Sequence, residues 1–160
     1  MTKRILVSLL LTMAVGATQA QTAALNMLKE YISKKTPGAI AMAFDRKDIM
    51  NLAKMKKTEK ERKAMEKLDF MGNISLRKAD AEVRDKFLAD ARRVEADGYI
   101  RINHAQMPNV PTDATILVKY AADGKTVSEL ISYNMTFNLC SWLYMHGLFT
   151  MEDVALLHSK

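Results

Sequence analysis

Two apolar segments rich in β-branched and aromatic residues flank the dipeptide Asp123-Gly124, and this feature restricts the fold more than any other. The segments cover residues 115–121 and 126–135. Asp-Gly tolerates the positive φ angles that a type I′ turn requires between hairpin strands. A two-residue loop predicts two cross-strand pairs: Tyr120 with Val127, and Ile116 with Ile131. The sequence therefore predicts an antiparallel β-hairpin.

The rest of the chain predicts further strands and helices around this hairpin. Apolar residues at helical spacing predict a helix over residues 23–35, and more helices are expected to begin after the capping residues Asp45, Thr58, Asp80 and Thr150. The expected strands cover residues 39–44, 68–76, 99–104, 115–121, 126–135 and 137–145. The last of these is apolar on both faces and is therefore expected at the centre of the sheet. We expect an α+β fold, a single antiparallel sheet of about five to six strands with helices packed mainly on one face.

The N-terminal residues 1–20 have the pattern of a signal peptide. Lys3 and Arg4 precede an apolar run over residues 5–15, and small and polar residues follow up to Ala20. A buried N-terminal helix is the alternative, but such a helix needs a polar face that this run lacks. No cysteine lies near the expected cleavage point, which excludes a lipoprotein. We expect an exported protein, periplasmic or extracellular, with a single domain over residues 21–160.

Composition limits what the exported domain contains. The full chain has 160 residues and a formal net charge of +6, which falls to +4 when Lys3 and Arg4 are removed. Cys140 is the only cysteine, so an intrachain disulfide is impossible and the hydrophobic core alone must hold the fold. After residue 20 no stretch reaches the length of a transmembrane helix. Nucleic acid is not an expected partner outside the cytoplasm.

The C-terminal part of the chain resembles a known protein family. The residues that carry the resemblance are the run Val127-Ser128-Glu129-Leu130-Ile131, residues 139–145, Gly147 and the capped helix start Thr150-Met151-Glu152-Asp153-Val154. This tail is similar to that of small exported domains of unknown function found in Bacteroidetes, and the resemblance extends over roughly residues 22–158. It implies a bacterial exported α+β domain. It implies no activity and no functional residues, because the family has none established.

Motifs of catalysis and metal binding are missing. The sequence contains neither a G-x-S-x-G elbow nor a glycine-rich phosphate loop, and its histidines, His104, His146 and His158, lack metal-ligand spacing. We interpret His104 and His146 as structural and His158 as solvated. Twelve methionines raise the possibility of copper, but no M-x-M or M-x-x-M pair occurs. We therefore expect Met50, Met55, Met65 and Met71 in the core, and Cys140 as well. No catalytic residue, metal ligand or cofactor is predicted.

Two aromatic residues leave two interpretations open. Trp142 and Tyr144 share one strand face with Cys140. If helices cover this face, both residues belong to the core, which we favour because the strand is apolar on both sides. If the face is open, they form an aromatic platform for a sugar or a peptide.

The segment over residues 46–67 is the most basic part of the chain. It carries nine lysines and arginines, against five acidic residues when Asp45 is included. The candidate contacts to an anionic surface are Lys54, Lys56, Lys57, Lys60 and Lys63. The alternative is a pair of solvated helices whose charges only keep the protein soluble.

Together these observations favour a non-enzymatic domain that binds another macromolecule or the anionic surface of the cell envelope. The first alternative is a small-molecule or metal carrier that uses methionine, histidine and aromatic side chains. An enzyme with a site built from scattered residues comes third. A pocket with convergent polar groups would favour the carrier or the enzyme.

Overall fold

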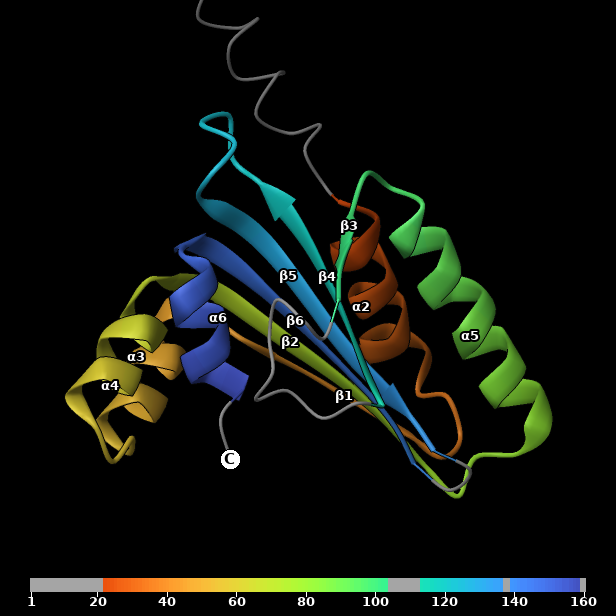
Figure 1. Ribbon diagram of the computed structural model, residues 1–160. Coiled ribbons are helices and arrows are strands. Elements are labelled where there is room, and N and C mark those ends of the chain that lie inside the picture. Colours follow the sequence, from red (N-terminus) through yellow and green to blue (C-terminus); the bar gives the residue numbers. More distant parts are fainter. Residues whose placement is uncertain (1–21, 104–112, 137–138, 159–160) are drawn as a thin grey trace, which may run out of the picture.

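The computed structural model describes residues 22–103, 113–136 and 139–158, which form five helices and six strands. The expected signal peptide and His104 lie outside these residues. Figure 1 shows the elements, which follow one another as α2 (Ala23–Lys34), β1 (Ala39–Phe44), α3 (Arg46–Lys54), α4 (Glu59–Glu66), β2 (Leu68–Arg77), α5 (Ala81–Glu95), β3 (Ile100–Ile102), β4 (Ala114–Tyr120), β5 (Val127–Met135), β6 (Leu139–Phe149) and α6 (Met151–His158). The predicted α+β class is confirmed.

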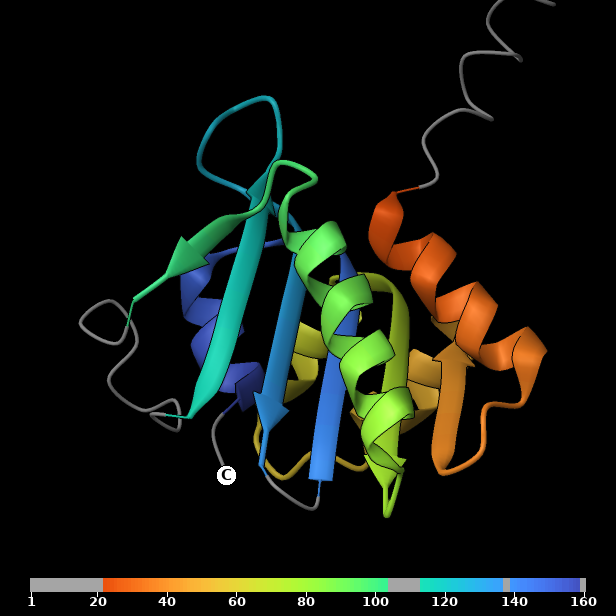
Figure 2. The same cartoon turned by 90° about the vertical axis from the view of Figure 1, so that its right-hand side faces the viewer.

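All six strands form a single antiparallel sheet in the order β1-β2-β6-β5-β4-β3. The chain builds one edge with β1 and β2, crosses through α5 to the other edge, and returns inward through β4 and β5. The strand β6 then enters between β5 and β2, which confirms that the apolar strand near the C terminus is central. Figure 2 shows α2 and α5 lying across the sheet on the side that faces the viewer.

The helices cover both faces of the sheet, whereas the sequence led us to expect them mainly on one. One core lies under α2 and α5 and contains Leu28, Phe87 and Trp142. The other lies under α3, α4 and α6 and contains Ile49, Met65 and Phe149. The two groups of helices are separate in Figure 1. Alternation along β5 and β6 sends apolar side chains to both sides, so each face needs a cover.

Four side chains begin four helices as predicted. Asp45, Thr58, Asp80 and Thr150 each accept a hydrogen bond from the backbone N–H three residues later. At α3 and α4 the residue three positions on also bonds back to the cap, which completes a capping box. The ends of these helices are therefore fixed by local hydrogen bonds.

The predicted register of the β4–β5 hairpin is correct at its tip and wrong further along. Tyr120 pairs with Val127, but Ile116 pairs with Ser132 and not with Ile131, because the register shifts by one residue next to Lys119. The loop is also longer than two residues, since Ala121 N–H donates to Thr126 O at 2.7 Å. Within the loop the Asp123 carboxylate accepts backbone hydrogen bonds from Lys125 and Thr126, which stabilise the longer connection.

Candidate functional site

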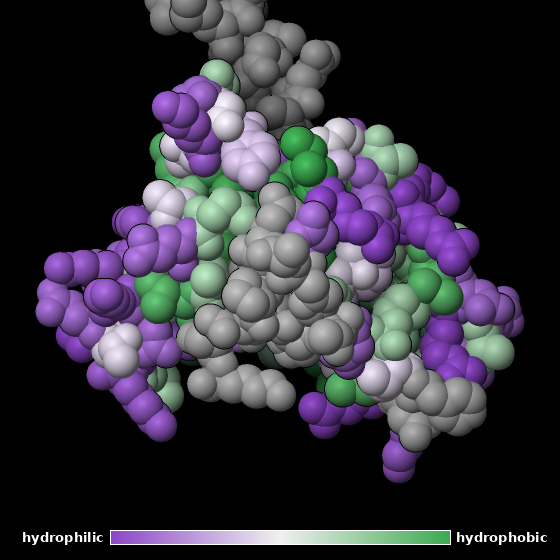
Figure 3. Space-filling view, viewed as in Figure 1, coloured by the Kyte–Doolittle hydropathy of each residue, from purple (hydrophilic) through white to green (hydrophobic). Residues whose placement is uncertain are grey.

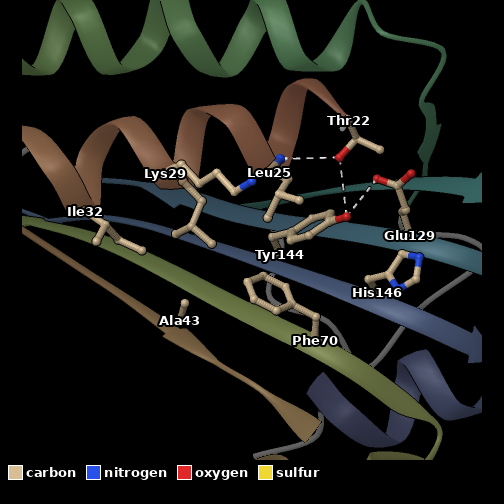
Figure 4. Close-up of a pocket in the computed structure, with 10 residues that line it drawn as sticks. Thr22, Leu25, Lys29, Ile32, Ala43, Phe70, Glu129, Tyr144 and His146 are labelled. Atoms are coloured by element: carbon tan, nitrogen blue, oxygen red, sulfur yellow. Dashed lines mark hydrogen bonds between the residues drawn. The ribbon is translucent and has the colours of Figure 1, made fainter. Parts of the chain in front are cut away.

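A cavity of about 570 Å³ lies between α2 and the sheet. Figure 4 shows its walls, with α2 above and β1, β2, β6 and β5 below. Its lining comprises Thr22, Leu25, Leu28, Lys29, Ile32, Ala43, Phe70, Glu129, Tyr144 and His146. This volume is within the range of pockets that hold small molecules. We call this space the α2 cavity.

Helical periodicity and one close approach position the apolar walls of the α2 cavity. Leu25, Lys29 and Ile32 stand on one side of α2 because residues four and seven positions apart share a helix face. Leu28 packs directly on Gly72 of β2, where a Cβ atom would lie 2.1 Å from Leu28 Cδ2. A glycine at this position therefore lets α2 lie close to the sheet beside the cavity.

The polar groups of the α2 cavity gather at one end and are joined by hydrogen bonds. Glu129 Oε2 accepts from Tyr99 Oη at 2.5 Å and from Tyr144 Oη at 3.2 Å. Tyr144 Oη in turn lies 3.4 Å from Thr22 Oγ1, which can donate to it. Figure 4 shows this chain from Thr22 through Tyr144 to Glu129, and His146 lies at the same end. The cavity therefore has a polar end, and the rest of its lining is apolar apart from Lys29.

The Glu129 side chain is nearly inaccessible to solvent. Its residue is only 7% exposed. Burying a carboxylate is costly unless hydrogen bonds replace its water, and the two tyrosine hydroxyls do so at Oε2. Among the residues that the structure describes, we find no donor to Oε1.

The tyrosines of this group are donors across the physiological pH range. Burial raises the pKa of Tyr99 far above 10, and the hydrogen bond to Glu129 and its charge raise it further. Burial also raises the pKa of Tyr144, and the charge of Glu129 adds to this effect while the Thr22 hydroxyl opposes it. Both hydroxyls therefore keep their protons and point them at the carboxylate.

A β-bulge places Glu129 in the α2 cavity. The register between β5 and β6 shifts between Val127 and Glu129. As a result Val127 is buried in the core under α3, α4 and α6, whereas Glu129 faces Tyr144 on the α2 side. Strict alternation would put both residues on the same face. Sequence reasoning missed Glu129 for this reason, and it also missed Thr22 and Tyr99 as members of the site.

Two further groups with a proton to donate border the α2 cavity. Lys29 extends along α2, and His146 is cross-strand partner to Glu129. The His146 side chain is 48% exposed, and its Nδ1 lies 4.0 Å from Asp69 Oδ2. His146 thus stands at the rim, whereas Glu129 is deeper in the protein.

The structure decides between the two interpretations of the aromatic pair. Trp142 is 0% exposed and Tyr144 is 2% exposed, and their rings stack with centroids 6.1 Å apart. They belong to the core, so the hypothesis of an open aromatic platform is wrong. Tyr144 nevertheless contributes to the α2 cavity, because its ring and hydroxyl line the cavity.

Two other sequence-based interpretations can be judged. Cys140 is buried as expected, and burial raises the pKa of its thiol. The prediction that His158 is solvated is wrong: its Nδ1 lies 2.9 Å from Val154 O, and burial lowers the pKa of its ring. The sequence pattern did not reveal that α6 packs beside α4 and that this histidine is half-buried.

The candidate lysines lie on α3, α4 and the turn between them, on the other side of the sheet from the α2 cavity. Lys63 forms an ion pair with Glu59 at 2.7 Å. Within the described part of the chain, Lys54, Lys56, Lys57 and Lys60 form no ion pair within 4.0 Å. Lys54 Nζ donates to Asn51 Oδ1 at 3.5 Å instead. Four cations are therefore available to bind an anion.

Neither metal ligands nor membrane-spanning helices are found in the described part of the chain. No three histidine, cysteine, aspartate or glutamate residues among those described are grouped so that they could hold a metal ion. None of the described helices is long and apolar enough to cross a membrane.

No protein-family model, curated protein or solved structure matches the chain. The resemblance to exported Bacteroidetes domains therefore stays a prediction, and function must be argued from the geometry of the site.

Proposed function

We propose that the protein binds a small, largely apolar molecule in the α2 cavity, and that Glu129 accepts a hydrogen bond from an ammonium or hydroxyl group of this ligand. The observation that carries the proposal is the buried Glu129 carboxylate, which two tyrosine hydroxyls hold at the polar end of an apolar cavity. A concave apolar space with a few converging polar groups is typical of ligand sites. The geometry thus favours the small-molecule alternative for this site.

The donors and acceptors of the site indicate which polar group the ligand carries. Tyr99 and Tyr144 both donate to Glu129 Oε2, and the described residues supply no donor to Oε1. We infer that the ligand's polar group donates to Oε1. An ammonium or a hydroxyl group supplies a proton to this oxygen. A ligand carboxylate would instead bring a second negative charge against a buried one, which costs free energy in a medium of low dielectric constant.

Our proposal includes a location outside the cytoplasm. The support is the signal-peptide pattern of residues 1–20. A protein that binds an apolar molecule there would carry or sequester it in an aqueous compartment. No residue of the site is assigned a catalytic role.

The proposal is tested with three probes that share one alkyl chain, namely octylamine, octanol and octanoate. We expect calorimetric titration of the purified protein to show binding of octylamine and octanol and much weaker binding of octanoate. Glu129→Gln should weaken octylamine binding by about tenfold or more, because a hydrogen bond to a charged group contributes about 1.5–3 kcal/mol.

The matched control is Glu95→Gln. Glu95 also accepts a hydrogen bond from a tyrosine, Tyr133, but it lies on α5 outside the lining of the α2 cavity. This change should leave octylamine binding unaltered. Ala43→Trp fills the cavity from the exposed edge strand and should abolish the binding of all three probes. Preferential binding of octanoate, or octylamine binding that ignores both Glu129→Gln and Ala43→Trp, would contradict the proposal.

A further inference from the structure

A second apolar cavity lies on the opposite face of the sheet, under α3, α4 and α6. Its volume is about 450 Å³ and it is open to solvent. Eight of its nine lining residues are apolar, and four of these are methionines: Leu52, Met55, Lys56, Met65, Leu68, Met71, Leu143, Met145 and Leu157. Methionine side chains are flexible and polarisable and adapt to apolar ligands of different shapes. We call this space the methionine groove.

Positive charge borders the methionine groove. Lys56 lines the groove itself, and Lys54 and Lys57 lie next to it in the chain. These three lysines form no ion pair within the described residues. Hydrogen bonds from Thr58 lower the pKa of Glu61, and the charges of Lys56 and Lys57 lower it further. In Figure 3 hydrophilic side chains gather over α3 and α4, with apolar side chains between them.

Met55 stands between Lys54 and Lys56 in the chain and is exposed, so the expectation that it belongs to the core is wrong. It is 80% exposed at the end of α3, although its side chain is large and apolar. An exposed apolar side chain flanked in the chain by lysines matches the interface of an anionic bilayer, where the apolar side chain enters the acyl region and the ammonium groups meet phosphates. Charge and hydropathy therefore point to the same kind of partner.

We propose that the turn between α3 and α4 docks on an anionic lipid bilayer, with Lys54, Lys56 and Lys57 at the lipid phosphates and with Met55 and the methionine groove accepting an acyl chain. This surface lies on the other face of the sheet from Glu129, so its test is independent of the proposed ligand site.

The first experiment is co-sedimentation with vesicles. We expect binding to vesicles of equal parts phosphatidylglycerol and phosphatidylcholine, and none to pure phosphatidylcholine. Changing Lys54, Lys56 and Lys57 together to Gln should lower the partition coefficient by about 100-fold, since each cation near an anionic surface contributes about 1 kcal/mol. The control is Lys35, Arg77 and Lys78 changed to Gln, which removes the same charge at the other end of β1 and β2 and should change binding little.

The second experiment tests the apolar half of the contact. Met55→Trp places an indole at this exposed position, and brominated acyl chains should quench its fluorescence when anionic vesicles are added. The natural Trp142 is buried in the core on the other face and supplies a constant background. In protein with labelled methionine methyl groups, short-chain phosphatidylglycerol should shift the signals of Met65, Met71 and Met145 and leave that of Met27 unchanged.

Three results would overturn the inference. The first is vesicle binding that survives about half-molar salt or ignores the lysine substitutions, because contact through phosphates must weaken when salt shortens the Debye length. The second is binding without quenching at position 55 and without methionine shifts, which would leave an electrostatic contact with no acyl chain. The third is a protein that does not bind vesicles but self-associates, and that loses this self-association when Met55 is changed to Ser. That result would assign the groove to contact with a second copy of the chain.

Discussion

At the scale of single residues, Gly147 of β6 stands where an added side chain would meet backbone atoms at the start of the neighbouring strand. A Cβ atom there would lie 2.3 Å from Lys67 O and 2.9 Å from Leu68 Cα. Backbone atoms cannot rotate away as a side chain can, so we expect Gly147→Ala to lower the free energy of unfolding by about 3 kcal/mol. Urea denaturation followed by circular dichroism measures this value. Gly72→Ala is the comparison, because its Cβ would meet the movable Leu28 side chain, and it should cost less. Equal losses would show that the β2–β6 backbone yields at this point.

The burial of some single residues could be predicted from the sequence, whereas the position of Glu129 could not. The burial of Cys140 and Trp142 followed from an apolar strand with no polar face. The role of Glu129 did not, because a bulge changes the face on which a residue lies without leaving a composition signal. The sequence signal for Glu129 was a charged residue within an apolar strand. This signal indicates a site only when the partner hydroxyls of Tyr99 and Tyr144 are known.

At the scale of elements, α6 depends on one carboxylate. Asp153 Oδ2 accepts from Thr150 N–H at 2.7 Å and from Lys67 Nζ at 2.7 Å, so it completes the capping box with Thr150 and ties α6 to the end of α4. Burial opposes ionisation, but these hydrogen bonds outweigh it and hold the pKa of Asp153 below its ordinary 3.8. A lowered pKa stabilises the fold above that ordinary value, and the contribution is lost as the pH falls through the folded-state pKa.

We therefore expect Asp153→Asn to reduce the free energy of unfolding at neutral pH by about 1–2 kcal/mol, the combined size of a lost cap and a partly exposed ion pair. The difference between wild type and variant should shrink as the pH falls below 4, and urea denaturation at several pH values measures it. Asp69→Asn serves as the control, because Asp69 pairs with Arg46 on the exposed surface and its loss should cost under about 1 kcal/mol. A difference that persists at pH 2 would contradict the linkage.

The elements themselves could be predicted largely because their signals are local. A helix cap needs only a hydroxyl or carboxylate at the right position, and all four expected caps are present. The strand register, and the face of the sheet that each helix covers, depend instead on contacts between residues far apart in the chain. The one-residue shift next to Lys119 and the division of helices between two faces arise from packing across the sheet, which periodicity along the chain does not encode.

At the scale of the whole molecule, the sheet separates two sites of different character. The α2 cavity has a buried carboxylate at its end, whereas the methionine groove has lysines at its rim. Because β6 contributes Tyr144 to one and Met145 to the other, adjacent residues of one central strand serve opposite faces. A ligand on one side and a bilayer on the other are thus compatible in a single copy of the chain.

The proposed export predicts the residue at which the mature chain begins. The signal-peptide pattern predicts cleavage after Ala20, and in the structure Thr22 is the N-cap of α2 and contacts Tyr144, 122 residues away in the chain. Cleavage beyond Thr22 would remove this cap, so we expect the intact mass of protein recovered outside the cytoplasm to place Gln21 first. In the chain that begins at Gln21, Thr22→Ala should cost about 1 kcal/mol of unfolding free energy, and Thr22→Ser, which keeps the hydroxyl, should cost little. Recovery of the uncleaved chain from the periplasm, or a first residue beyond Thr22, would show that the domain does not begin with this cap.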